Sequence, residues 1–242
     1  MPTWVPNWSC IREGTGLRPG LLRGRTADHL FQWNASGNML IGAHISKDGN
    51  VLNCKGVHLA TITDVVHPVD DNGPLNLRSI LKSFYAAYNI NSFNQVALFT
   101  ALRKTLLKTG YIDELVSQHV PVPTFIKICN IFLARTSTLR ENDAELVGKL
   151  FCCLKMTMED RCFYTGMTAK DERGESIMGV TFPFSRKGDV IAVLYGCRWP
   201  VLLRRRGLEE RGGFMVPGEG YVNGFMNEGL ELGISEKVFE IY

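Results

Sequence analysis

The stretch KGDVIAVLYGCRWPVLLRRRGLEERGGFMVPGEGYVNGFMNEG, residues 187–229, decides the fold of this chain. Its apolar run at residues 190–195 has no polar alternation, so this strand should be covered on both faces, by the interior of a sheet and by helices. Glycines then separate a series of short apolar segments. Short strands at regular spacing are typical of a sandwich or a partly closed barrel.

Strand-like segments lie on both sides of a helical middle. Before it, apolar runs at residues 39–45 and 51–66 are joined by a turn with the step Asp48-Gly49, which predicts a hairpin. Because strands flank the helices in the sequence, we expect the first group of strands to join the second group in one sheet. The later strands are expected at residues 161–166, 177–182, 189–195, 200–204, 213–216 and 220–225.

The middle of the chain has the apolar spacing of about four helices. The second helix is predicted to begin at Ser92, where Gln95 completes a capping box, and to end at Gly110. The four helices are expected at residues 75–90, 92–110, 122–135 and 139–157.

Together these patterns predict an α+β protein, with a mostly antiparallel sheet, or a partly closed β-barrel or sandwich, and a central helical layer. We expect a single domain over residues 1–242. Within it, residues 1–70 would supply N-terminal strands and a loop, residues 74–157 the helical layer, and residues 161–242 the C-terminal strands.

Composition excludes several classes of function. Charged residues make up 21% of the chain and the net charge is +3, so no electrostatic footprint for a nucleic acid is expected. The run Arg204, Arg205 and Arg206 is predicted to be a solvated hairpin end. No apolar span reaches the roughly 18 residues that a membrane helix needs, and the N-terminus lacks a signal-peptide pattern, so a cytoplasmic protein without a membrane span is expected.

The sequence contains no complete motif for binding a metal or a cofactor. Seven scattered cysteines lack the C-x-x-C pairs of a zinc site, and free buried thiols are expected. Asp70 and Asp71 resemble part of an aspartate-rich motif, but a turn that caps the following helix explains this pair better. No nucleophile elbow G-x-S-x-G occurs. We therefore predict that the protein uses no metal and no cofactor.

A candidate site is expected where aromatic residues meet glycine-rich strand ends. There a barrel mouth could open, with an apolar pocket and a few convergent donors. Packing and strand termination would also explain these aromatic residues. The residues predicted to shape the pocket are Tyr195, Trp199, Tyr221, Phe225 and Trp33, and the candidate catalytic donors are Arg198, Asn223, His44 and His58.

Motifs that carry a family resemblance extend over nearly the whole chain. They are WVPNWS at 4–9, FQWNASGN at 31–38, GVHLATITDVV at 56–66, RCFYT at 161–165, KGDVIAVLYGCRWPVLLRR at 187–205 and GEGYVNGFMNEG at 218–229. In order and spacing they resemble the C-terminal region of fungal heterokaryon incompatibility (HET) proteins. Gly220 stands where that family has a cysteine, and Asn223 stands where it has a histidine.

In that family these segments follow a signalling HET domain. Because WVPNWS begins three residues after Met1, the resemblance implies a stand-alone protein or an excised fragment without that domain. Stand-alone relatives resemble proteins of fungal natural-product pathways, including the norbornene-forming Diels-Alderase of sordaricin-type pathways. The resemblance thus implies a cofactor-independent cyclase, of the pericyclase type, that acts on an apolar terpenoid-like substrate in secondary metabolism.

Other classes of function remain open. One alternative is a non-enzymatic interaction module derived from a heterokaryon incompatibility protein, and another is a hydrolase or isomerase that uses one of the histidines. A homodimer is also left open. An enclosed apolar cavity would favour the cyclase, because a pericyclic reaction needs a shaped cavity and a polarising donor. A packed core with an exposed apolar patch would favour the interaction module.

Overall fold

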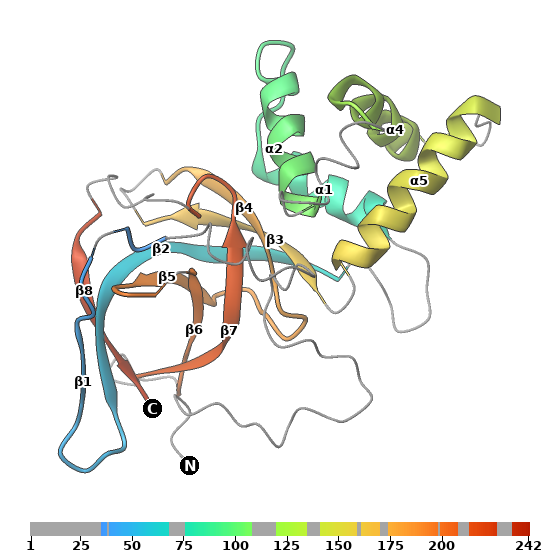
Figure 1. Cartoon of the computed structure of the whole chain (residues 1–242). Coiled ribbons are helices and arrows are strands. Elements are labelled where there is room, and N and C mark those ends of the chain that lie inside the picture. The colour runs from blue at the N-terminus through green and yellow to red at the C-terminus, as the bar shows by residue number, and fades with distance from the viewer. Residues whose placement is uncertain are drawn as a thin grey trace, which may run out of the picture.

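A ring of strands lies beside a group of helices in the computed structural model (Figure 1). The part of the chain that the structure describes comprises residues 35–37, 39–67, 76–107, 120–134, 141–158, 161–169, 174–197, 199–207, 213–226 and 234–242. The predictions for residues 1–34, and those for Asp70, Asp71, Gly110 and Arg198, lie outside these residues.

Helices and antiparallel strands together confirm the predicted α+β class. The strands are β1 (Ala43–Ile45), β2 (Leu52–Val66), β3 (Cys162–Thr168), β4 (Ser176–Thr181), β5 (Val190–Leu194), β6 (Val201–Arg205), β7 (Phe214–Val222) and β8 (Glu236–Ile241). The described helices are α1 (Leu77–Ala87), α2 (Gln95–Leu107), α4 (Val122–Ala134) and α5 (Glu141–Met158), and none of them is both long and apolar enough to span a bilayer.

The strands close into a ring in the order β2-β3-β4-β7-β6-β5-β2. β2 makes the closure because it pairs with β3 over residues 60–66 and with β5 over residues 56–61. β1 forms the predicted hairpin with β2, and β8 pairs with β2 over residues 52–57. The prediction that N-terminal strands join the C-terminal sheet is therefore confirmed.

Three apolar clusters hold the fold together. The ring core receives residues from all six strands of the ring, so it fills the ring interior; it includes Val57, Leu59, Ile62, Tyr164, Ile177, Ile191, Val193, Leu202 and Val222. The outer core lies on the opposite face of β5 and β6; it includes Cys54, Val190, Ala192, Leu194, Leu203, Phe239 and Ile241. The helical core joins helix residues such as Phe84, Phe99 and Phe125 to Phe163, Met178, Val180 and Tyr221 of the strands.

β5 is buried on both faces, as its unbroken apolar run predicts. Ile191 and Val193 face the ring core, whereas Val190, Ala192 and Leu194 face the outer core. The prediction that helices provide one of the covers is wrong, because β8 covers the outer face of β5. The helices pack instead against β2, β3 and β4.

The segments at residues 213–216 and 220–225 were expected to form two strands, but the first and the start of the second form one strand, β7. The register against β6 shifts between Leu202, which pairs with Gly218, and Arg204, which pairs with Met215. This irregularity accommodates Pro217, because a proline has no N–H to give to a regular ladder. Sequence patterns also missed β8, which lies outside the expected strands.

A capping box precedes α2 one residue earlier than predicted. The Asn91 backbone N–H donates to Asn94 Oδ1 at 2.8 Å, and the Asn94 backbone N–H donates to Asn91 Oδ1 at 3.2 Å. Asn91 also accepts from the backbone N–H of Phe93 at 3.0 Å. Asn91 is therefore the cap in place of Ser92, because its short carboxamide reaches the free N–H groups of the first turn.

We predict opposite stability effects for two Gly→Ala substitutions. A Cβ at Gly179 would collide with the Tyr221 carbonyl and the Tyr164 ring, so Gly179→Ala should lower the free energy of unfolding by about 1–3 kcal/mol. Nothing lies within 4 Å of a Cβ at Gly148 on α5, so Gly148→Ala should raise the free energy of unfolding by about 0.5–1 kcal/mol. Urea unfolding measures both effects, and a Gly179→Ala variant as stable as the parent would contradict this packing.

Candidate functional site

The structure separates the predicted site residues instead of gathering them in one pocket. Trp199 and Tyr221 pack on the helical core, whereas Tyr195 and Phe225 pack on the ring core. Asn223 is half-buried in the turn after β7, and its backbone N–H donates to the Met178 carbonyl at 3.0 Å. Trp33 and Arg198 lie outside the described residues.

Tyr195 and Phe225 come to the same end of the ring. Because β5 and β7 both run antiparallel to β6, their C-terminal ends point the same way, and the two aromatic residues follow those ends. Ile234 also packs on the ring core, and Ala35 is a buried member of it. We call the end of the ring that carries Tyr195 and Phe225 the ring mouth. Its floor is apolar, since Val57 and Val193 are 3% and 1% exposed.

A polar group borders the ring mouth. Lys55 Nζ lies 3.0 Å from Glu236 Oε1, and both side chains are about half exposed. Burial, together with the neighbouring Glu236 carboxylate, raises the pKa of the Tyr195 hydroxyl. The hydrogen bond from Lys55 lowers the pKa of Glu236. Tyr195 is thus a neutral hydrogen-bond donor beside a carboxylate and an ammonium group.

Strand register explains how this group forms. Glu236 pairs with Val57, and paired residues project from the same face of a sheet. Lys55, two residues before Val57, shares that face. His44 pairs with Asn53, which is two residues before Lys55, so the exposed His44 lies on the same face but farther from the ring. Of the predicted donors, His44 is therefore on the sheet face that leads to the ring mouth.

His58 lies elsewhere, on the other face of β2. Its Nε2 is 3.0 Å from Thr61 Oγ1, next to the register shift between His58 and Ala60. Burial lowers the pKa of the His58 imidazole, and the positive charges of Lys237 and Arg205 lower it further. The His58 imidazole is therefore neutral at pH 7, and it does not belong to the ring mouth.

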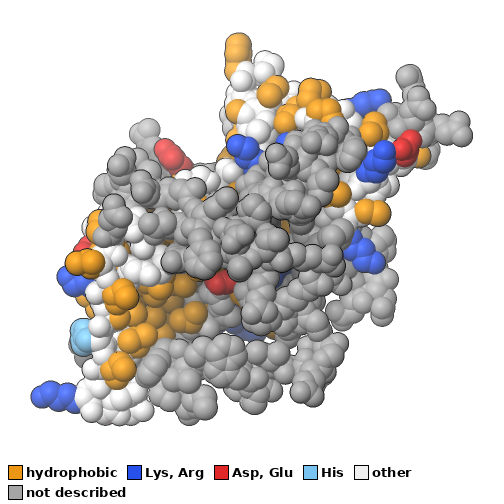
Figure 2. Space-filling model, viewed as in Figure 1, with side chains coloured by type: hydrophobic (Ala, Val, Ile, Leu, Met, Phe, Trp, Pro, Cys, Tyr) orange, Lys and Arg blue, Asp and Glu red, His pale blue; other side chains and the backbone are white. Residues whose placement is uncertain are grey.

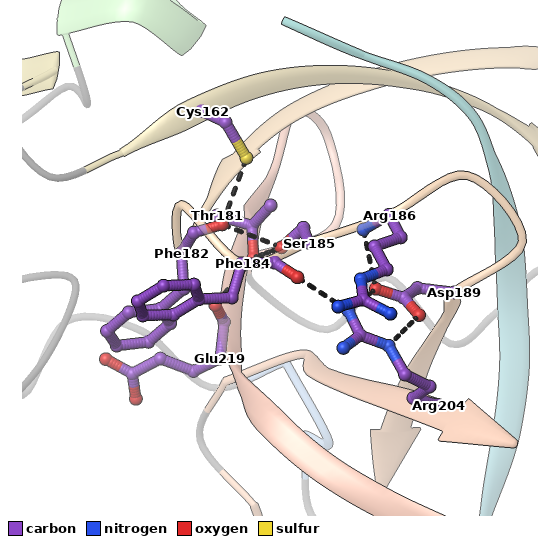
Figure 3. A network of polar contacts seen from close by, with 9 residues as sticks. All are labelled: Cys162, Thr181, Phe182, Phe184, Ser185, Arg186, Asp189, Arg204 and Glu219. Carbon is purple, nitrogen blue, oxygen red and sulfur yellow. Dashed lines mark hydrogen bonds and ion pairs between the residues drawn. The ribbon is translucent and has the colours of Figure 1, made fainter. Parts of the chain in front are cut away.

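The opposite end of the ring is closed by a polar network (Figure 3). Arg204 makes a two-point contact with Asp189, from Nε to Oδ1 and from Nη2 to Oδ2, both at 2.8 Å. The Asp189 side chain is 3% exposed, and it also accepts the backbone N–H of Arg186 at 2.8 Å. The prediction of a solvated Arg204 is wrong, because this side chain joins β6 to the loop before β5.

Cys162 belongs to the same network but cannot act as a nucleophile at neutral pH. Its thiol donates to the Phe182 carbonyl at 3.0 Å, and burial raises its pKa to about 12. Ser185 is also buried, and its hydroxyl donates to Phe182 O at 2.8 Å and lies 3.2 Å from Thr181 Oγ1. These contacts fix the β4–β5 loop in place and give this end of the ring a structural role.

Outside the ring, the structure offers little chemistry. A wide-open hollow of about 460 Å³ lies along α4, and Lys127 is the only ionisable residue in its lining; the others are Pro123, Ile126, Asn130, Ile131 and Ala134. Within the described ranges, no three His, Cys, Asp or Glu side chains converge on a point where a metal ion could bind.

Comparison with known proteins gives no relative for this chain. No family model, no curated protein and no solved structure matches it. The resemblance to the C-terminal region of HET proteins therefore stays a prediction, and the site has to be judged from its own geometry.

Sequence reasoning missed Lys55 and Glu236. The alternation of β8, with Glu236, Val238 and Glu240 on one face, is a strand signal that could have been read. Its pairing with Lys55 had no signal, because two solvent-exposed charges in distant segments carry no local pattern.

We predict a pH-dependent contribution of His58 to stability. Because its folded pKa lies below the ordinary value of 6.5, the unfolded chain binds this proton more tightly. The contribution is present above about pH 6.5 and declines as the pH falls below it. Urea unfolding at several pH values should show a smaller loss of stability on acidification in His58→Gln than in the parent. The exposed His44→Gln serves as the control, and equal acid sensitivity of His58→Gln and the parent would refute this.

Proposed function

We propose that this chain is a non-enzymatic interaction module whose edge strand β1 pairs with a second copy of the chain. The observation that carries the proposal is an exposed apolar segment at residues 39–45. Leu40 is 88% exposed, Ile41 76% and Ile45 54%. Figure 2 shows hydrophobic side chains gathered on the side of the ring where β1, β2 and β8 lie.

β1 has the properties of an unprotected sheet edge. In the described part of the chain its only strand partner is β2. Proteins commonly protect such edges with charged residues or prolines, which discourage another strand from pairing. Residues 39–45 contain no Asp, Glu, Lys, Arg or Pro. The ring core, in contrast, is packed with side chains such as Tyr164 and Leu202 that are fully buried.

A second copy suits this edge because the segment has no charge to repel its own equivalent. Pairing about a two-fold axis would place the two segments antiparallel and bury Leu40 and Ile45 of both chains. A strand pair of this length buries less than the roughly 1,000 Å² of a stable interface, so a weak, concentration-dependent dimer is expected.

Sedimentation velocity over a range of protein concentrations tests this proposal. The parent chain should shift from monomer to dimer as the concentration rises. The double variant Leu40→Lys with Ile45→Lys should stay monomeric over the same range, because like charges would face each other across the edge. Val96 on α2, 61% exposed, supplies the control Val96→Lys, which should dimerise like the parent. A parent that is monomeric throughout, or a double variant that still dimerises, would contradict the proposal.

A second candidate function is the cofactor-independent cyclase, and the ring mouth is the observation that favours it. There Tyr195 is half-buried against the apolar ring core, as are Phe225 and Ile234. In this proposal the apolar substrate lies on these side chains, and Tyr195 turns from Glu236 to donate a hydrogen bond to an activating carbonyl. Lys55 keeps Glu236 neutralised when Tyr195 leaves it. One such donor, placed in advance, can lower a barrier by about 2–4 kcal/mol.

Product analysis with a linear diene-dienophile precursor bearing a terpenoid-like chain tests the cyclase. The parent should change the product ratio from that of the uncatalysed reaction. Tyr195→Phe should lower the rate by about 100-fold or more, because it removes the donor and keeps the ring. Trp199→Phe, on the helical core, is the control and should keep most of the rate. Product ratios equal to those without protein would exclude a cyclase for this substrate class.

A further inference from the structure

The loop between β4 and β5 presents an aromatic side chain to solvent. Phe184 is 69% exposed, although Thr181 and Ser185 close to it are buried. The next two residues after Ser185, Arg186 and Lys187, are also exposed. An exposed ring beside two cations is an arrangement that neither of the functions proposed above uses.

This loop is held in place at several points. Arg204 Nη2 donates to the Phe184 carbonyl at 2.6 Å, and Ser185 Oγ donates to the Phe182 carbonyl at 2.8 Å. The Arg186 backbone N–H is bound by Asp189. Figure 3 shows how Arg204 and Asp189 meet beneath the loop. Phe184 is therefore presented by a preorganised loop, which reduces the entropy lost when the ring contacts a partner.

The loop at residues 182–188 itself carries two cations and no acidic residue. Asp189, the acidic residue that follows it, is neutralised by Arg204. Among the described residues, no ion pair with a carboxylate forms at Arg186 or Lys187. Arg205 and Arg206 continue from Arg204 and add two exposed cations to this end of the ring. Glu240 and Asp48 act on Tyr242 together with Arg206, so two acidic groups lie near Arg206. The acidic residues closest to the loop in the strands are Glu219, whose carbonyl accepts from Thr181, and Asp64, two residues after Ile62, whose carbonyl accepts from Gly188.

An exposed aromatic ring flanked by cations fits the surface of an anionic bilayer. Aromatic side chains insert at the boundary between headgroups and acyl chains, while Lys and Arg bind the phosphates above it. A single-stranded nucleic acid is the other polyanion that contacts rings and cations. Such binders present successive aromatic residues along a basic groove, whereas here Phe182 is half-buried and Phe184 is the one exposed ring of the loop.

We propose that residues 182–188 dock this protein on an anionic membrane surface, with Phe184 inserted between the headgroups and with Arg186 and Lys187 on the phosphates. The ring mouth lies at the other end of the ring, so docking through this loop would leave it free.

Co-sedimentation of the full chain with vesicles tests the proposal. Vesicles of phosphatidylcholine that contain phosphatidylserine should bind the protein, and vesicles of phosphatidylcholine alone should not. Phe184→Ala should weaken binding about tenfold, because it removes the inserted ring. Arg186→Gln with Lys187→Gln should weaken it about 25-fold, from roughly fivefold for each lost cation, and added salt should weaken binding by the parent.

A matched control is available in Phe93→Ala. Phe93 is 98% exposed, precedes α2 and has no charged neighbour from residue 89 to residue 97, so its loss should leave vesicle binding unchanged. Thermal unfolding of each variant checks that these exposed substitutions preserve the fold. The proposal is overturned by a parent that does not bind anionic vesicles, by equal binding to both kinds of vesicle, or by full binding in Phe184→Ala. It is also overturned if the same residues bind oligo(uridylate) while vesicles are ignored.

Discussion

β2 is hydrogen-bonded along both edges, and the closed ring depends on this double pairing. One edge pairs with β3 and the other with β5, so a strand from before the helices joins both ends of a sheet made after them. The close approach requires Gly56, since a Cβ there would collide with the Val193 carbonyl. Without this closure the ring core would face water along a whole side, which is why the N-terminal and C-terminal segments must fold together.

Closure also gives the ring two chemically different ends. At one end, the Asp189–Arg204 pair is largely removed from water and uses both carboxylate oxygens, so it fixes the β4–β5 loop with defined geometry. At the other end, Tyr195 and Phe225 are only half-buried, and Lys55 and Glu236 remain open to solvent. The surfaces open to a partner or a ligand are therefore the ring mouth, the edge strand β1 and the outer side of the β4–β5 loop.

Much of the fold could be predicted because it follows from local patterns. The Asp48-Gly49 step and the apolar runs beside it predict the β1–β2 hairpin, in which Gly49 adopts a φ of 74°. Helical spacing placed all four described helices to within a few residues. The errors occur where a distant contact overrides the local signal. The ladder with β6 keeps β7 continuous past Pro217, and Arg204 is withdrawn from solvent by Asp189.

The sequence by itself determined most of the segments that become strands and helices, and that β5 is buried on both faces, because apolar periodicity records how many faces of a segment avoid water. Burial of apolar surface is not directional, so the same pattern could not say that β8 covers the outer face of β5. Only the tertiary structure decided that Lys55, Glu236 and Tyr195 meet and that the predicted aromatic residues divide between two cores. Those outcomes depend on the register of paired strands, which is fixed when the ring closes.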